Sequence, residues 1–164
     1  MTKALSPLSQ ARKSYQPKLP TVLRGGAANV AIKFGNKTES VKDQAKVAEL
    51  FQNTYGAPTL ELVEGQGKEA HALTVGVILS GGQAPGGHNV IAGIFDGIKS
   101  VHSESRLLGF LGGPGGFEEG KFIEITASLM DEYRNTGGFD IIASGRTKLE
   151  THAQFDTCIE VVKE

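Results

Sequence analysis

The sequence is poor in several features that define broad classes of protein. It has no tryptophan and only one cysteine, Cys158, which rules out an internal disulfide framework. No apolar stretch approaches the roughly 20 residues that a membrane-spanning helix needs. The net charge is −1, so nothing points to nucleic acid. We expect no nucleic-acid partner and no membrane partner, and we interpret Cys158 as a buried helix residue in a reducing compartment.

Acidic residues are missing from the beginning of the chain. The first one is Glu39, and seven lysines and arginines precede it. A basic, acid-poor start is typical of an organelle transit peptide. Pro7, Pro17 and Pro20, however, interrupt the helical amphipathicity of this region. We predict a cytoplasmic protein and keep a transit peptide as the alternative.

Glycine, by contrast, is abundant, with 22 residues, and its most informative cluster is the turn 80–88 (SGGQAPGGH). The run 73–79 before it is apolar and partly β-branched, as in a buried strand, and 89–101 after it has helical apolar spacing. Backbone without Cβ lets a ligand approach main-chain N–H groups, and the start of the helix adds its dipole. The pattern predicts a phosphate site; the alternative is a tight turn that binds nothing.

Two other patterns could also suggest a ligand, with less support. Residues 115–121 (GGFEEGK) match G-x-x-x-x-G-K, but Phe122 stands where a Ser or Thr would hold magnesium, and two glutamates would repel phosphates. We interpret this as a chance match. His88, at the edge of the turn 80–88, could touch a phosphate, cap the helix or point to solvent. The chain's histidines lack the spacing of a metal site, so we expect no zinc.

From residue 73 onward, strand-like and helix-like segments alternate, which predicts an α/β fold with a partial doubly wound parallel sheet. Residues 1–70 form an N-terminal extension, and 71–164 the first part of an α/β domain. The extension is expected to hold a disordered or extended leader (1–20), a small hairpin (21–36), one helix (to about Gln52) and a strand-like piece within 57–70. The domain is expected to hold strands at 73–79, 106–111, 122–125 and 139–143, and helices at 89–101, 126–135 and 149–164.

Three separated motifs carry a resemblance to a known family. They are GGQAPGGHN (81–89), GFLGGPGGFEEGK (109–121) and GGFDIIASGRTKLET (137–151). Together they resemble the phosphofructokinases, and most of all the long-form pyrophosphate-dependent branch, because Gln83 stands where ATP-dependent members usually carry Asp. The resemblance implies that Gly81 and Gly82 meet the terminal phosphate of the phosphoryl donor and that Arg146 binds the same phosphates. Without the resemblance, Arg146 could equally be a solvated surface charge.

The family's chemistry depends on two motifs that do not occur before Glu164. One is an acidic loop that holds magnesium, and the other carries the aspartate that activates the sugar hydroxyl. We therefore expect an N-terminal portion of a longer enzyme, with no catalytic residue and no metal ligand in this chain, inactive alone, whose Mg²⁺ ligands lie beyond Glu164.

By resemblance, the intact enzyme moves a phosphoryl group reversibly from diphosphate to the 1-hydroxyl of fructose 6-phosphate, in glycolysis and gluconeogenesis. The resemblance also implies an allosteric homo-oligomer or hetero-oligomer. Two alternatives stay open. One is a non-catalytic regulatory subunit or interaction module of the same fold, and the other is an ATP-dependent 6-phosphofructokinase.

Overall fold

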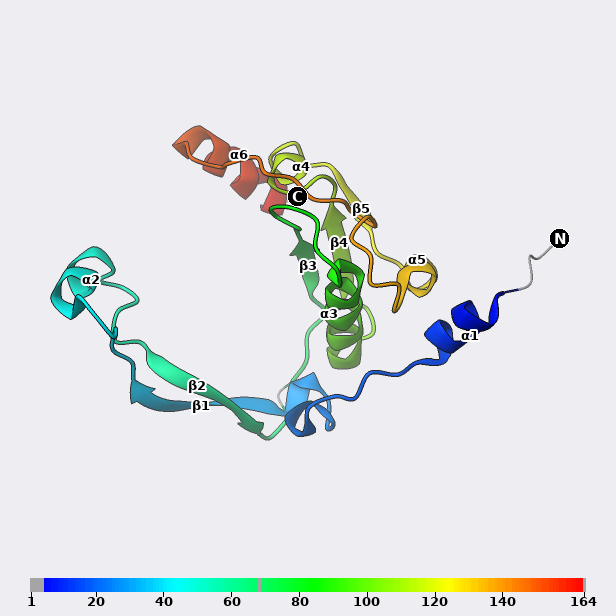
Figure 1. Ribbon diagram of the computed structural model, residues 1–164, viewed down its shortest axis with the longest axis horizontal. Helices are drawn as coiled ribbons and strands as arrows, with labels where there is room; N and C mark the ends of the chain where they lie inside the picture. Colours follow the sequence, from blue (N-terminus) through cyan, green and yellow to red (C-terminus); the bar gives the residue numbers. More distant parts are fainter. Residues whose placement is uncertain (1–4, 68, 164) are drawn as a thin grey trace. The chain divides into compact units, whose positions relative to one another are not determined.

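The computed structural model describes residues 5–67 and 69–163. The chain divides into two compact units. One unit runs from Leu19 to Glu69, and the other combines the residues up to Lys18 with those from Ala70 onward. The boundary expected between residues 70 and 71 remains a prediction. Figure 1 shows the elements of both units along the chain.

The unit 19–69 is built on a two-stranded antiparallel ribbon. Strand β1 (Val30–Lys37) pairs with β2 (Pro58–Glu64), and the helix α2 (Gln44–Leu50) lies between them in sequence. Two 3-10 turns, η1 (Thr21–Leu23) and η2 (Ala27–Asn29), precede β1. The hairpin expected within 21–36 does not form, because β1 takes its partner from beyond α2. Its apolar side chains then lie opposite apolar partners, as in the pair Phe34 and Leu60.

The second unit contains a three-stranded sheet with the order β3-β4-β5. Strands β3 (Thr74–Val77) and β4 (Arg106–Phe110) are parallel, and the helix α3 (Gly87–Val101) connects them. Strand β5 (Phe122–Glu124) runs antiparallel to β4. The fold is therefore mixed α/β, as expected, with a parallel pair of strands. The short strand expected at 122–125 is present, but its direction departs from an all-parallel sheet.

The core lies between α3 and one face of this sheet, and Figure 1 shows α3 beside β3 and β4. Val75 and Val77 of β3 point to this side, while Thr74 and Gly76 point to the other, as the alternation of a strand requires. The residues buried in the core come from β3, α3, β4 and the stretches 125–130 and 141–142, and are Val77, Ile91, Ala92, Phe95, Leu107, Ile125, Met130, Ile141 and Ile142.

The strand expected at 139–143 is absent. Ile141 and Ile142 are buried, but this stretch has no ladder, and only Ser80 and Gly145 form an isolated parallel bridge. The reason is a contact with a residue far away in the sequence. The backbone N–H groups of Asp140 and Ile141 donate to a side chain, the ring of His88, instead of to a neighbouring strand. An apolar run alone cannot reveal that kind of partner.

The leader also differs from expectation, since it contains the helix α1 (Pro7–Ser14). The hydroxyl of Ser6 accepts a hydrogen bond from the Ser9 N–H, and Pro7 occupies the first helical position, where its missing N–H costs nothing. The side chain of Asn135 donates to the carbonyls of Arg12 and Tyr15, at 3.0 Å each. These contacts attach α1 to its unit. Residues 1–4 lie outside the described residues.

Three more helices complete the unit, namely α4 (Pro114–Glu118), α5 (Ala127–Tyr133) and α6 (His152–Lys163). Helix α6 begins with a capping box, in which the Gln154 N–H donates to the Thr151 hydroxyl and the Gln154 side chain accepts from the Thr151 N–H. Cys158 is buried in α6, as expected. Burial raises the pKa of its thiol, and the nearby charge of Glu118 adds to that rise.

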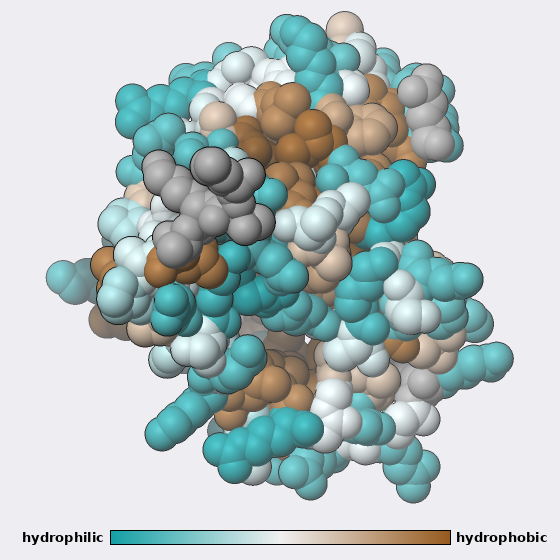
Figure 2. Space-filling view, turned by 90° about the vertical axis from the view of Figure 1, so that its right-hand side faces the viewer, coloured by the Kyte–Doolittle hydropathy of each residue, from teal (hydrophilic) through white to brown (hydrophobic). Residues whose placement is uncertain are grey.

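Apolar side chains also reach the surface, and Figure 2 shows several such patches on one face. The exposed apolar side chains include four neighbours on one face of the β1–β2 ribbon, Ile32, Phe34, Leu60 and Leu62. Within residues 5–67 and 69–163, no helix combines the length and the apolar character needed to cross a membrane.

Candidate functional site

Two glycine-rich turns and the segment 141–147 meet at the carboxyl ends of β3 and β4, the edge at which open α/β sheets bind ligands. The turn after β3 reaches the segment 141–147, because the Gly81 N–H donates to the Gly145 carbonyl at 2.8 Å. The turn after β4 reaches the same segment, because the Gly112 N–H donates to the Ile142 carbonyl at 2.8 Å. Gly113 packs so closely on Gly145 that a Cβ at position 113 would overlap the Gly145 backbone.

The expected site residues Gly82 and Arg146 come together at this edge. A Cβ built on Gly82 would lie 2.8 Å from Nη2 of Arg146, so the guanidinium rests directly beside bare main chain. Both residues are exposed. Within the described part of the chain, Arg146 makes no ion pair and no side-chain hydrogen bond. Its five N–H donors therefore remain available in a geometry that suits phosphate oxygens.

The turn also keeps unused main-chain donors. Among the residues that the structure describes, no acceptor is recorded for the N–H groups of Gly82, Gln83 and Ala84, and all three residues are exposed. Gly81 has a φ of 101°, a conformation that favours glycine. The turn thus exposes consecutive amide donors next to a fixed positive charge, which is a chemically suitable arrangement for an anion.

The start of α3 offers fewer free N–H donors to an anion than the sequence pattern predicts. The N–H groups of Gly86 and His88 donate to the carbonyls of Gly137 and Gly138, at 2.9 and 3.0 Å. These two donors are therefore occupied by the chain itself, and the exposed amides without an acceptor among the described residues, Gly82 to Ala84, belong to the turn. The helix also begins at Gly87, slightly earlier than the expected Asn89.

His88 differs from each of its expected roles. His88 is only 1% exposed, and its ring contacts the segment 136–141. The side chain therefore neither faces solvent nor lies open to a ligand. Burial lowers the pKa of His88, while the Asp140 carboxylate opposes that shift. The sequence carries one weak signal of this burial, because the histidine stands between a glycine pair and a helix with an apolar pattern. Its partners, however, lie some fifty residues further along the chain.

The second glycine-rich match, residues 115–121, folds differently from a phosphate loop. Gly115 to Glu118 lie inside the helix α4, and Glu119 pairs with Lys121. Gly115 approaches the site from this side, since a Cβ there would lie 2.8 Å from the Thr147 hydroxyl oxygen. The interpretation of GGFEEGK as a chance match is consistent with this helix.

A metal is not supported by the residues described. Across 5–67 and 69–163, no group of three or more His, Cys, Asp or Glu side chains is arranged to hold an ion. The magnesium that the resemblance implies therefore does not fit these residues.

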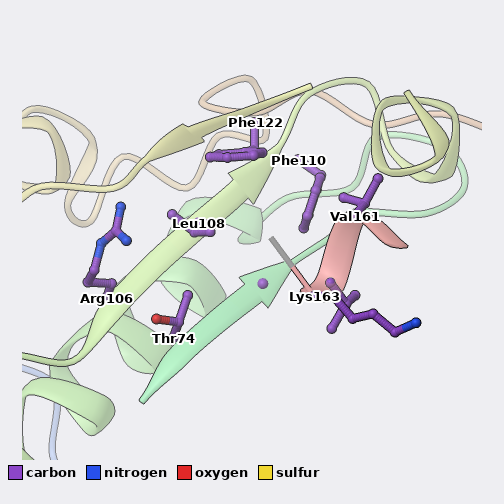
Figure 3. A pocket seen from close by; sticks show the side chains of 9 residues that line it. Thr74, Arg106, Leu108, Phe110, Phe122, Val161 and Lys163 are labelled. Carbon is purple, nitrogen blue, oxygen red and sulfur yellow. The ribbon is translucent and has the colours of Figure 1, made fainter. Parts of the chain in front are cut away.

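A hollow of about 390 Å³ lies on the other face of the sheet, away from the glycine turns. Figure 3 shows side chains from β3, β4 and β5 around it, with the end of α6. Neither Gly82 nor Arg146 lines it. Arg106, which does, is already paired with Glu124, with 2.7 Å between Nη2 and Oε2. The hollow is therefore separate from the Gly82–Arg146 site.

Comparison with known proteins gives a consistent result. No protein-family model matches the chain. The chain is 52% identical over 162 residues to the pyrophosphate–fructose 6-phosphate 1-phosphotransferase of Porphyromonas gingivalis, covering 98% of this chain and 29% of the relative. The enzyme of the same name from Treponema pallidum is 47% identical, over 97% of this chain and 30% of the relative. Subunit alpha 1 of the Arabidopsis thaliana enzyme is 36% identical, over 95% and 27%.

The matches run along almost the entire chain, whereas the chain spans less than a third of the length of these relatives. The homology therefore includes the extension 1–70 as well as the glycine turns, and it agrees with the resemblance carried by the three motifs. The chain is homologous to the pyrophosphate-dependent phosphofructokinases and corresponds to an N-terminal portion of them.

Proposed function

We propose that this chain supplies part of the phosphoryl-donor site of an enzyme that transfers a phosphoryl group reversibly between diphosphate and the 1-hydroxyl of fructose 6-phosphate. In this proposal the N–H groups of Gly82 to Ala84 and the guanidinium of Arg146 hold the terminal phosphate of diphosphate. Gly81 contributes to the site through its positive φ, which shapes the turn. The single observation that carries the proposal is the contact between Gly82 and Arg146.

The chemistry of phosphoryl transfer explains why such a site is useful. Charge spreads over the oxygens of the transferred group, so catalysis consists mainly of positioning and of electrostatic stabilisation. Amide donors and a guanidinium that are already in place lower the cost of holding that charge, because few groups must reorient. These residues bind and orient the donor. Sugar binding, the metal and the base are assigned to parts of the relatives that this chain does not match.

We further propose that the isolated chain does not catalyse turnover, that its sheet belongs to a larger doubly wound domain, and that the intact protein is a cytoplasmic oligomer. Support for the oligomer comes from relatives that are named as alpha and beta subunits. Support for the inactivity comes from the lack of a metal cluster within the described residues. Turnover of diphosphate and fructose 6-phosphate by the isolated chain with magnesium would contradict it.

A chimera tests the proposed site directly. This chain replaces the matching 162-residue segment of the Porphyromonas gingivalis enzyme, and diphosphate-dependent turnover is measured. We expect the chimera to be active and Arg146→Ala to lower kcat/KM for diphosphate by about 10- to 100-fold, since a charge-assisted bond to phosphate contributes about 1.5–3 kcal/mol.

Lys148 provides a matched control, because it is an exposed cation two positions away that pairs with Glu150. Lys148→Ala should leave kcat/KM within about threefold, as expected for a weak surface pair. Equal rates for Arg146→Ala and the unmodified chimera would remove Arg146 from the site. Activity with ATP but not with diphosphate would favour the ATP-dependent alternative.

A further inference from the structure

The ring of His88 is a buried polar group outside the proposed site, only 1% exposed, and both of its nitrogens make polar contacts. Nε2 accepts hydrogen bonds from the N–H groups of Asp140 and Ile141, at 3.0 Å each. Nδ1 lies within hydrogen-bonding distance of the Thr136 hydroxyl oxygen. The histidine at the start of α3 is thus attached to three residues of a distant segment.

These contacts assign the protonation state of the ring. Two N–H groups donate to Nε2, so this nitrogen carries no proton, and the proton of the neutral ring is on Nδ1. Nδ1–H then donates to the Thr136 oxygen, whose own hydroxyl donates to the Tyr133 carbonyl at 2.6 Å. A proton on Nε2 would face two N–H donors, a repulsive arrangement.

The charged and titratable groups around the ring are few. The Asp140 carboxylate lies 3.1 Å from Nε2, but its side chain is 76% exposed, so water screens its charge. The Tyr133 ring, on α5, makes an edge contact with centroids 4.9 Å apart. On its own helix, no charged side chain within the described residues is bonded to His88. Burial therefore dominates, and it keeps the pKa of His88 below its ordinary value.

The segment bound by His88 leads directly to the proposed phosphate site. It is anchored to the turn 80–88 near one end by the Gly86 and His88 N–H groups and further along by the Gly81 N–H, which donates to Gly145. Arg146 follows immediately. The approach is close, since a Cβ at Gly138 would lie 2.6 Å from Cε1 of the ring. The backbone of 138–145 thus runs from the His88 ring to the place where Arg146 meets Gly82.

A side-chain acceptor is needed here for a physical reason. The N–H groups of Asp140 and Ile141 have no strand partner, and a buried N–H without an acceptor costs about 1–3 kcal/mol. The ring removes this cost without a neighbouring strand, which explains how the apolar stretch 139–143 packs against α3 although it is not part of the sheet.

We propose that His88 is a positioning residue for phosphoryl-donor binding: its neutral ring holds the backbone of Asp140 and Ile141 against α3 and thereby sets Arg146 opposite the free amides of the turn. This inference rests on the proposed function in so far as Arg146 binds diphosphate. It assigns to His88 no contact with the substrate.

The experiment uses the 164-residue chain and two substitutions with matched size. His88→Gln can place its carbonyl oxygen near the position of Nε2 and keep an acceptor for both N–H groups, whereas His88→Leu removes the acceptor. The first readout needs no ligand: amide hydrogen exchange of Ile141 and of Gly81, whose N–H reports on the bond to Gly145. The second is the affinity for inorganic diphosphate by titration calorimetry, alone and combined with Arg146→Ala.

We expect His88→Leu to speed exchange at Ile141 and Gly81 about tenfold or more and to weaken diphosphate binding about tenfold, with His88→Gln within about threefold of the unmodified chain. We also expect Arg146→Ala to reduce the affinity for diphosphate by a smaller factor in the His88→Leu background, because His88 acts through the position of Arg146. Unchanged Gly81 exchange in His88→Leu would overturn the inference.

Two further measurements separate the possible failures. If His88→Leu does not fold, Thr136→Val serves instead, since it removes the acceptor of Nδ1–H and leaves Nε2 in place. We expect ring ¹⁵N shifts of the unmodified chain to report a proton on Nδ1, and faster Gly81 exchange in Thr136→Val. A proton on Nε2 would overturn the inference. If the unmodified chain does not bind diphosphate, the proposed function fails, while the exchange data still decide the role of His88.

Discussion

Gly82 and Arg146 are distant in sequence, yet a methyl group on Gly82 would lie 2.8 Å from a guanidinium nitrogen of Arg146. Two bonded turns produce this proximity, since Gly81 and Gly112 both donate to the segment that carries Arg146. The contact places a permanent positive charge beside exposed amides at the carboxyl edge of the sheet.

Gly82→Ala should affect binding more than stability. Gly82 has no positive φ in the structure, so alanine fits its backbone, and the new methyl group meets only the mobile end of a side chain. We expect the free energy of unfolding to change by less than about 1 kcal/mol. Diphosphate affinity should fall about tenfold, because the methyl group displaces the guanidinium. Chemical denaturation and calorimetry measure the two quantities.

Gly81→Ala is the matched control for that substitution. Gly81 has a φ of 101° and open space around it, so alanine would be strained rather than crowded. We expect a loss of about 1–2 kcal/mol in the free energy of unfolding. If Gly82→Ala instead destabilised the fold while leaving the affinity for diphosphate unchanged, the close contact with Arg146 would have no bearing on binding.

The pKa of His88 predicts how stability depends on pH. The folded-state pKa lies below the unfolded value of about 6.5, so the unfolded chain binds more protons as the pH falls. The stabilising effect of the neutral ring is therefore complete above about pH 6.5 and declines as the pH falls toward the folded-state pKa. The slope from this group cannot exceed about 1.4 kcal/mol per pH unit. Urea denaturation between about pH 7.5 and 5 measures it.

The variant His88→Gln isolates that contribution, because glutamine does not titrate and can keep an acceptor. Its free energy of unfolding should vary less with pH than that of the unmodified chain over the same range. Identical slopes for the two chains would show that His88 is not held neutral by burial.

Core packing on α3 can be tested with adjacent residues. Ile91 is fully buried against the sheet, whereas its neighbour Val90 is 56% exposed. Ile91→Ala should reduce the free energy of unfolding by about 2–5 kcal/mol, since it leaves a cavity in the core. Val90→Ala should change it by no more than about 0.5 kcal/mol. Similar losses for both substitutions, measured by chemical denaturation, would contradict the orientation of the helix.

Sequence patterns predicted the elements whose signals are local. The apolar run near Val75 and the helical spacing through Phe95 lie within a few residues of the strand and the helix that they produce. Arg146 and Gly82 were expected at one site from a family resemblance, and the structure brings them together. Their binding of diphosphate remains a prediction.

The expectations that proved wrong depend on contacts between residues far apart in the sequence. The direction of β5 depends on the path through α4, and the partner of β1 comes only after α2. The stretch around Ile141 has the apolar pattern of a buried strand. Its backbone N–H groups, however, donate to the ring of His88, which lies far earlier in the chain. Carbonyls of Gly137 and Gly138 likewise occupy the helix donors that the pattern assigned to phosphate.

The most direct test of the account is an NMR titration of the ¹⁵N-labelled chain with inorganic diphosphate, followed at the amides of Gly82, Gln83 and Ala84 and at the Arg146 side chain. We expect saturable shifts at these groups, with little change at Gly86 and His88, whose N–H groups are already bonded. We also expect their loss in Arg146→Ala. Shifts confined to other surface lysines and arginines, or unaltered by that substitution, would contradict the claim that Gly82 and Arg146 form one phosphate site.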